Sequence, residues 1–137
     1  MSQFIEVELV RVVVHERNDQ QVIGLQERGG ERSFPIVIGT NEAFEIHRKI
    51  TGIESQRPLT HDLIGNLLRA CDASVERVVI SDLRGGTFYA VIVIQLASGD
   101  SVEVDSRPSD AIALSVQSGC PIYASEQVFE ELGRPPE

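Results

Sequence analysis

The sequence predicts an α+β domain in which helices pack on a mainly antiparallel sheet. Three observations point to it: strand-like apolar runs follow one another with short turns between them, a helical pattern follows each set of three, and this order occurs twice in the 137 residues. Glu42-Ala43 and Asp110-Ala111 hold equivalent places in the two halves, which supports a duplicated unit of three strands and two helices. We expect one domain over residues 1–137, with its core at about residues 3–132 and a frayed tail at 133–137.

The first half predicts three consecutive, antiparallel strands at residues 5–14, 21–26 and 33–38. A helix follows with Thr40 or Asn41 as its N-cap, because both side chains can accept a hydrogen bond from the first turn. Its apolar face is predicted to comprise Ala43, Ile46, His47 and Ile50.

A second helix closes the first half. Pro58 excludes helix for Arg57, so this helix is predicted to begin with Thr60 as its N-cap. Its buried face is predicted to contain Leu63, Ile64, Leu67, Leu68 and Cys71. The sequence has no Cys-x-x-Cys pair, and both Cys71 and Cys120 are predicted to be buried, reduced thiols.

The second half repeats the order of elements. The predicted elements are strands at 75–83, 87–96 and 101–104, a helix starting at Pro108 as N1 or after Ser109 as N-cap, an extended piece at 121–124, and a last helix capped by Ser125.

The charge balance excludes a general attraction to nucleic acid or to anionic lipid. Twelve Lys and Arg residues stand against twenty-one Asp and Glu residues, which gives a net charge of −9. Lys49 is the single lysine, so an anion contact would come from a placed arginine. The longest apolar run, Phe88–Ile94, is far shorter than the roughly 20 residues of a membrane helix, and we expect a cytoplasmic protein without a membrane partner.

The first candidate site is the segment from Asp105 to Asp110, where a strand ends and a helix begins. Two carboxylates flank a rigid Arg107-Pro108 joint, so Asp105 and Asp110 are candidate ligands for Mg²⁺ or Mn²⁺ while Arg107 binds a phosphate. In a purely structural alternative, Asp110 complements the helix dipole and Arg107 pairs with Asp105.

The second candidate site is the segment from Arg57 to Asp62. His61 is a candidate general base, Arg57 a candidate substrate contact, and Asp62 a further metal ligand, as is Glu42 in the preceding helix. Adjacent residues on a helix diverge by about 100°, so His61 and Asp62 are not expected to reach one atom. Helix capping alone is the alternative explanation of this segment.

Three motifs resemble those of the bifunctional nuclease family, formerly a domain of unknown function: Arg57-Pro58-Leu59-Thr60-His61-Asp62-Leu63, Gly86-Thr87-Phe88-Tyr89-Ala90, and Asp105-Ser106-Arg107-Pro108-Ser109-Asp110-Ala111-Ile112-Ala113-Leu114 followed by Pro121-Ile122-Tyr123. Pro35-Ile36-Val37-Ile38-Gly39 with Glu42-Ala43 is also similar. The resemblance implies an α+β domain, often oligomeric, from bacteria or plants, to which RNase and DNase activity has been attributed. It brings no settled catalytic residues.

Two functions remain open from the sequence. The first is a nuclease that hydrolyses phosphodiester bonds with a divalent metal and no organic cofactor; its catalytic residues would be Asp105, Arg107, Asp110 and His61. Because the chain is acidic, short or single-stranded nucleic acid would be repelled least. The second is a non-enzymatic, homo-oligomeric interaction or regulatory module in which Arg107 and Asp110 pair with each other or with neighbouring carboxylates.

Overall fold

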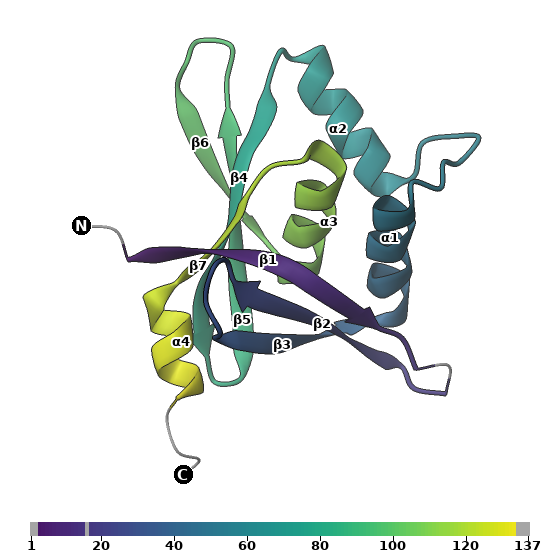
Figure 1. Cartoon of the computed structure of the whole chain (residues 1–137). Helices are drawn as coiled ribbons and strands as arrows, with labels where there is room; N and C mark the ends of the chain where they lie inside the picture. Colours follow the sequence, from purple (N-terminus) through teal and green to yellow (C-terminus); the bar gives the residue numbers. More distant parts are fainter. Residues whose placement is uncertain (1–2, 16, 134–137) are drawn as a thin grey trace.

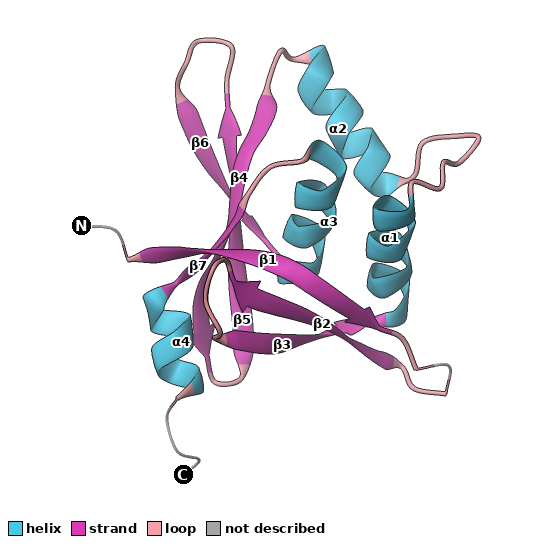
Figure 2. Ribbon diagram, viewed as in Figure 1, coloured by secondary structure: helices cyan, strands magenta, loops and turns pink. Residues whose placement is uncertain are grey.

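The computed structural model, which describes residues 3–15 and 17–133, confirms the predicted α+β class (Figures 1 and 2). Seven strands form one sheet in the order β3-β2-β1-β7-β4-β5-β6. The strands are β1 (Phe4–Val13), β2 (Gln20–Glu27), β3 (Ser33–Gly39), β4 (Ser74–Arg84), β5 (Thr87–Gln95), β6 (Ser101–Ser106) and β7 (Ile122–Ser125).

The sheet consists of two antiparallel meanders joined by β7. β7 pairs antiparallel with β1 through Val7 and Ile122 and parallel with β4 through Val78 and Ile122. The extended piece predicted at 121–124 therefore lies at the centre of the sheet. This piece lies between the last two helices, as predicted, and because it pairs with β1 as well as β4, the second half is not a simple copy of the first.

The helices are α1 (Thr40–Thr51), α2 (Thr60–Ala70), α3 (Pro108–Ser118) and α4 (Glu126–Leu132). α1, α2 and α3 lie together on one side of the sheet, and α4 lies apart from them beside β4 and β7 (Figure 1). None of the helices in the described part of the chain is long and apolar enough to cross a membrane.

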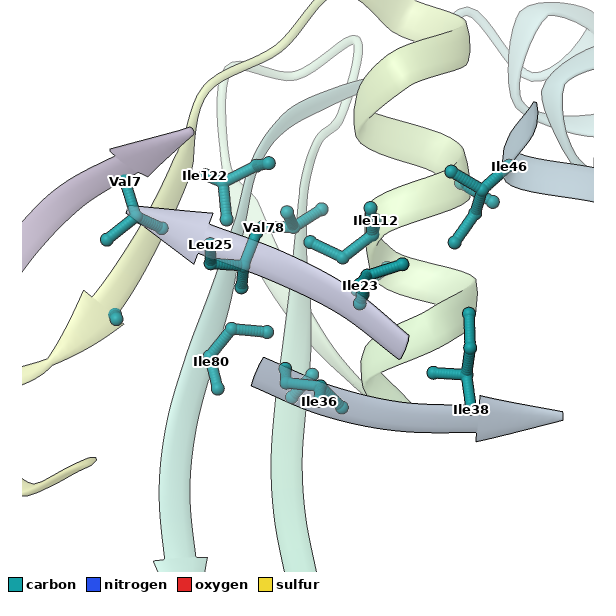
Figure 3. Close-up of a cluster of buried hydrophobic side chains, with 14 of the residues drawn as sticks. Val7, Ile23, Leu25, Ile36, Ile38, Ile46, Val78, Ile80, Ile112 and Ile122 are labelled. Carbon is teal, nitrogen blue, oxygen red and sulfur yellow. The ribbon is translucent and has the colours of Figure 1, made fainter. Parts of the chain in front are cut away.

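The core lies between the sheet and the helices and draws on both halves of the chain. Figure 3 shows Ile112 of α3 and Ile46 of α1 facing side chains of β2 and β4, among them Ile23 and Val78. α3 is the most deeply buried helix, because its residues 111–115 are all shielded from solvent. The first turn of α3, which contains Asp110, is therefore anchored by the buried residues that follow it.

The predicted inner face of α2 is partly wrong. Leu63 and Leu67 are about half exposed and Cys71 is exposed, whereas Gly65 is buried. The close approach of α3 explains the difference, since a Cβ at Gly65 would collide with the amide nitrogen of Gln117. This contact selects Ile64, Gly65 and Leu68 as the inner side and turns the other leucines outward.

Helix α1 also has a narrower buried face than predicted. Ala43 and Ile46 are buried, but His47 and Ile50 are exposed because only one side of this helix meets the sheet and α3. The predicted caps shift by one residue, with Gly39 preceding α1 and Leu59 preceding α2.

The later helix starts agree with the sequence. Pro108 is the first residue of α3, and Ser125 caps α4 by accepting a hydrogen bond from the Gln127 N–H at 3.2 Å. Of the predicted tail at 133–137, Gly133 ends α4, and residues 134–137 lie outside the described residues.

Candidate functional site

The candidate site lies where the first turns of three helices meet. Each of these helices carries a carboxylate at its third position: Glu42 in α1, Asp62 in α2 and Asp110 in α3. A carboxylate is favourable there because the helix dipole places partial positive charge at the N-terminus. Helix chemistry therefore explains why each residue is acidic, and the packing of the three helices brings them into one network.

Arg107 and Asp110 form the centre of this network, called here the outer pair. The Arg107 Nε atom donates to Asp110 Oδ2 at 2.9 Å, and a terminal nitrogen of Arg107 lies 3.3 Å from Oδ1 and 3.7 Å from Glu42 Oε2. Burial works to raise the pKa of Asp110, but the hydrogen bonds from Arg107 and His61 outweigh it and the pKa is lowered. The hydrogen bond with Asp110 in turn raises the pKa of Arg107. Both groups are charged at neutral pH.

His61 links α2 to the outer pair. Its Nε2 atom lies 2.8 Å from Asp110 Oδ1, and its Nδ1 atom lies 3.7 Å from Glu45 Oε2. If Asp110 accepts the Nε2–H, the neutral ring carries its lone pair on Nδ1. This is the arrangement in which a carboxylate orients a histidine as a proton acceptor.

Asp62 belongs to a second group, called here the inner cluster, with Glu45, Arg48 and Lys49. Arg48 donates to Glu45 at 2.8 and 2.9 Å and to Asp62 at 3.0 Å, and the Lys49 ammonium donates to Asp62. The hydrogen bond from Lys49 and that from the Leu59 backbone N–H lower the pKa of Asp62 to about 2. The Arg48 hydrogen bond likewise lowers the pKa of Glu45. As expected, neighbouring His61 and Asp62 reach different partners.

Gln117 of α3 holds the first turn of α2 through a hydrogen bond to its backbone. Its side-chain amide donates to the backbone carbonyl of His61 at 2.9 Å, and the glycine at position 65 leaves room for the amide against α2. The imidazole of His61 is thus held through its backbone as well as by Asp110. Gln117 is a positioning residue for His61.

The remaining predicted site residues lie apart from this network. The carboxylate of Asp105 is exposed on β6, on the sheet face that it shares with Glu103, and it has no hydrogen bond or ion pair with any described residue. Arg57 is exposed in the loop between α1 and α2. The structure therefore joins Asp110 to Arg107 and His61, and Arg107 pairs with Asp110 and Glu42 and not with Asp105.

Three surface depressions meet at Arg107, whose side chain lines all of them. A polar depression of about 600 Å³ contains Glu42, Glu45, His61 and Asp110. An apolar groove of about 810 Å³ runs between α2 and α3 on one side and β5 and β6 on the other. A third depression of about 390 Å³ lies over β3 and the turn before β5. The Arg107 side chain is 65% exposed, so solvent reaches it although it pairs with Asp110.

The donor set does not fit a divalent metal in this arrangement. Asp110 already binds Arg107 with both of its oxygens and His61 with one of them. Among residues 3–15 and 17–133 there is no group of three or more His, Cys, Asp or Glu side chains placed to hold a metal ion. The Mg²⁺ or Mn²⁺ site on Asp105 and Asp110 stays a prediction.

Sequence reasoning missed Glu45, Arg48, Lys49 and Gln117. The charged side chains at 42, 45, 48 and 49 follow three- and four-residue spacing along α1, and this pattern was the signal for a charged helix side. Gln117 gave no such signal, because its role depends on how closely α2 approaches α3.

The chain is similar to known proteins over most of its length. The family model described as the bifunctional nuclease domain matches residues 22–137. Two uncharacterized proteins of Mycobacterium tuberculosis, from strains CDC 1551 and H37Rv, are each 41% identical to it over 128 residues. These residues cover 93% of this chain and 76% of each relative.

Proposed function

The chain belongs to the bifunctional nuclease family, and from that premise we propose that it cleaves phosphodiester bonds in DNA or RNA at Arg107, Asp110 and His61. The observation that carries the proposal is the 2.8 Å contact between Asp110 and His61 beside an exposed arginine, at the meeting point of three depressions. A phosphate binder and an oriented proton acceptor are the two groups that such a hydrolysis needs.

In the proposed reaction Arg107 binds the scissile phosphate and stabilises the charge that develops on its oxygens. His61 Nδ1 takes a proton from a water molecule in the polar depression. The water oxygen bonds to phosphorus, the phosphorus–oxygen ester bond breaks, and the proton on His61 returns to the leaving oxygen through solvent. Glu42 and Glu45 repel the phosphate backbone from the polar depression, so that depression is left to water.

The acidic charge of the chain selects among nucleic acids. A net charge of −9 repels long polyanions, and Arg107 offers one local contact in place of a basic surface. We propose short or single-stranded substrates for this reason. Cleavage of labelled single-stranded DNA and RNA measures the relative rates on the two nucleic acids.

The test is cleavage of labelled single-stranded DNA and RNA by purified protein, with EDTA, Mg²⁺ or Mn²⁺ in parallel arms. His61→Gln and Asp110→Asn are expected to lose activity at least a hundredfold, and His47→Gln, which changes an exposed histidine of α1, is the matched control. All variants are prepared identically so that contaminating nuclease appears equally in each.

The metal arms decide between two chemistries. Cleavage that persists in EDTA and depends on His61 supports the side-chain mechanism. Cleavage that needs Mg²⁺ or Mn²⁺ and is lost in Asp105→Asn supports the predicted metal site instead. Equal activity in the wild type and in the His61 and Asp110 variants would overturn the proposal.

One observation favours the second candidate, the interaction module. Arg107 and Asp110 pair with each other, which is the arrangement expected if the joint is structural. Leu59, Leu63 and Leu67 form an exposed apolar line along α2 at four-residue spacing, a feature typical of contact surfaces. A homo-oligomer that buries this line is part of this second candidate, and sedimentation of the wild type against Leu63→Lys tests it.

A further inference from the structure

The apolar groove beside Arg107 has features of a binding site that phosphate chemistry alone does not explain. It lies between helix side chains and the inner face of the sheet edge, and its volume of about 810 Å³ is within the range typical of small-molecule pockets. Six aliphatic side chains line its length: Ile64, Leu68, Ile92, Ile94, Val104 and Leu114.

The groove also has polar lining residues, which include Arg107. Thr60, His61, Asp105, Ser106 and Asp110 line the groove together with Arg107, and Phe88 lies on the same face of β5 as Ile92 and Ile94. A ligand that fits has an anionic group for Arg107 and a flat or apolar part that reaches inward past Phe88.

We propose that the groove holds one unpaired nucleobase of a single-stranded nucleic acid whose adjoining phosphate binds Arg107. This inference rests on the proposed function and deepens it, because it specifies the substrate as a single strand with a base turned into the protein. A base in a duplex is stacked and paired, and it enters such a groove only after it unpairs, which weakens binding of a duplex.

Two features favour a nucleobase over a fatty acyl chain. β6 is the edge strand of the described sheet, so its outward backbone N–H and C=O groups have no partner strand among the described residues and can pair with the polar edge of a base beside the groove. The third depression continues from Arg107 on the other side, past Pro108 and Phe88, and a polymer can follow it while a single acyl chain cannot. Stacking of bases on aromatic rings is the usual means of holding single strands.

Val102 and Val104 provide a matched pair of variants. Both lie on β6, on the same face of the strand, and they are 41% and 42% exposed, but only Val104 lines the groove. Because both side chains reach solvent, a glutamate at either position is tolerated by the fold, and the change in net charge is the same. Any difference between the two variants reports on the groove.

The experiment measures binding of a fluorescent single-stranded hexanucleotide by anisotropy, with probe integrity checked on a gel and His61→Gln used as background wherever the probe is cut. Val104→Glu is expected to weaken binding more than tenfold, and Val102→Glu less than twofold. A duplex of the same sequence is expected to bind at least tenfold more weakly than the single strand. Equal effects of the two substitutions would overturn the groove assignment.

A second measurement separates the base from the phosphate and binding from catalysis. Adenosine monophosphate is expected to shift the methyl NMR signals of Ile92, Ile94 and Val104, and ribose 5-phosphate, which has the phosphate without the base, is not. Shifts from decanoate but not from adenosine monophosphate would replace the nucleobase with an acyl ligand and overturn the proposal. Base binding without cleavage would leave this inference standing and remove the proposed hydrolysis.

Discussion

The outer pair and the inner cluster both pair basic side chains with carboxylates, but their basic side chains differ in exposure to solvent. In the inner cluster the side chains of Arg48 and Lys49 are 14% and 9% exposed and are held by two carboxylates, whereas Arg107 of the outer pair is 65% exposed. A guanidinium enclosed by carboxylates has no donors left for a ligand. The comparison indicates that the inner cluster fixes α1 against α2, and it supports the proposal that the more exposed Arg107 binds substrate.

His61 is the residue that contacts both the outer pair and the inner cluster. Its Nε2 atom faces Asp110 of the outer pair and its Nδ1 atom faces Glu45 of the inner cluster. An imidazole between a rigid group and an accessible one is suited to proton transfer, because its orientation is fixed while one nitrogen lines the polar depression. The following changes test whether the two regions have separate roles.

The largest expected effect comes from breaking the outer pair. Arg107→Gln is expected to lower kcat/KM on a single-stranded substrate by about 10²–10³, which is the usual loss when a transition-state charge contact is removed. The stability measured by urea unfolding is expected to change by less than about 1 kcal/mol, because the side chain is largely exposed. Arg28→Gln, which removes a pair with Glu6 and Glu8, is the control.

A large loss of stability in Arg107→Gln with no loss of activity per folded molecule would reverse the assignment. In that case the outer pair would be the structural one. Arg107→Lys sharpens the result, since a lysine retains the charge but not the two-pronged geometry, and intermediate activity is expected.

The second effect comes from breaking the inner cluster. Arg48→Gln removes hydrogen bonds to Glu45 and Asp62 and leaves two half-buried carboxylates without a guanidinium, so we expect a loss of about 2 kcal/mol in the free energy of unfolding. Activity of the folded protein at low temperature is expected to stay within threefold of wild type. Urea unfolding followed by circular dichroism measures the first quantity, and initial cleavage rates measure the second.

Much of the fold is predictable from the sequence, because strands and helix starts depend on local patterns. The alternation at 33–38 and the Pro108 start of α3 are examples, and the structure has both. The inner face of α2 was not predictable. Leu63 and Ile64 are equally apolar, and the choice of Ile64 as the inner residue depends on the contact of Gly65 with α3, which is tertiary.

The candidate site shows the same division. Arg107, Asp110 and His61 are recognisable as polar groups at helix starts, but nothing in their spacing says that His61 meets Asp110 across 49 positions of chain. Strand alternation predicts that Asp105 shares a sheet face with Glu103, and the structure confirms this. Its closeness to Asp110 in the sequence did not bring the two carboxylates into one hydrogen-bond network.

A third, smaller effect concerns the charge of Asp62 in the inner cluster. Its pKa is lowered to about 2 from an ordinary value of 3.8, so it contributes stability that is present above about pH 4 and is lost as the pH falls through about 2. Asp62→Asn keeps an oxygen for the Leu59 N–H but removes the charge, and we expect it to be about 1 kcal/mol less stable at pH 6 and to approach wild type as the pH falls through about 2. Urea unfolding across that range measures the difference, with Asp100→Asn, in an exposed turn, as control. A constant difference at all pH values would show that packing and not charge is responsible.

The smallest effect tests why Glu42 is within reach of Arg107. The residue before α3 is Arg107, which pairs with Asp110 in the first turn, whereas the residue before α1 is Gly39, which has no charge to offer Glu42. The Glu42 carboxylate lies over Gly39, where an added Cβ would meet it. Gly39→Ser supplies a better N-cap and displaces the flexible Glu42 carboxylate, and we expect a gain of about 0.3 kcal/mol with little change in activity. A loss of stability instead would mean that the Glu42 carboxylate stabilises the start of α1 more than a serine cap does. Glu42 would then lie near Arg107 only because α1 requires that residue, and Glu42→Gln would lower stability without changing how tightly the hexanucleotide binds.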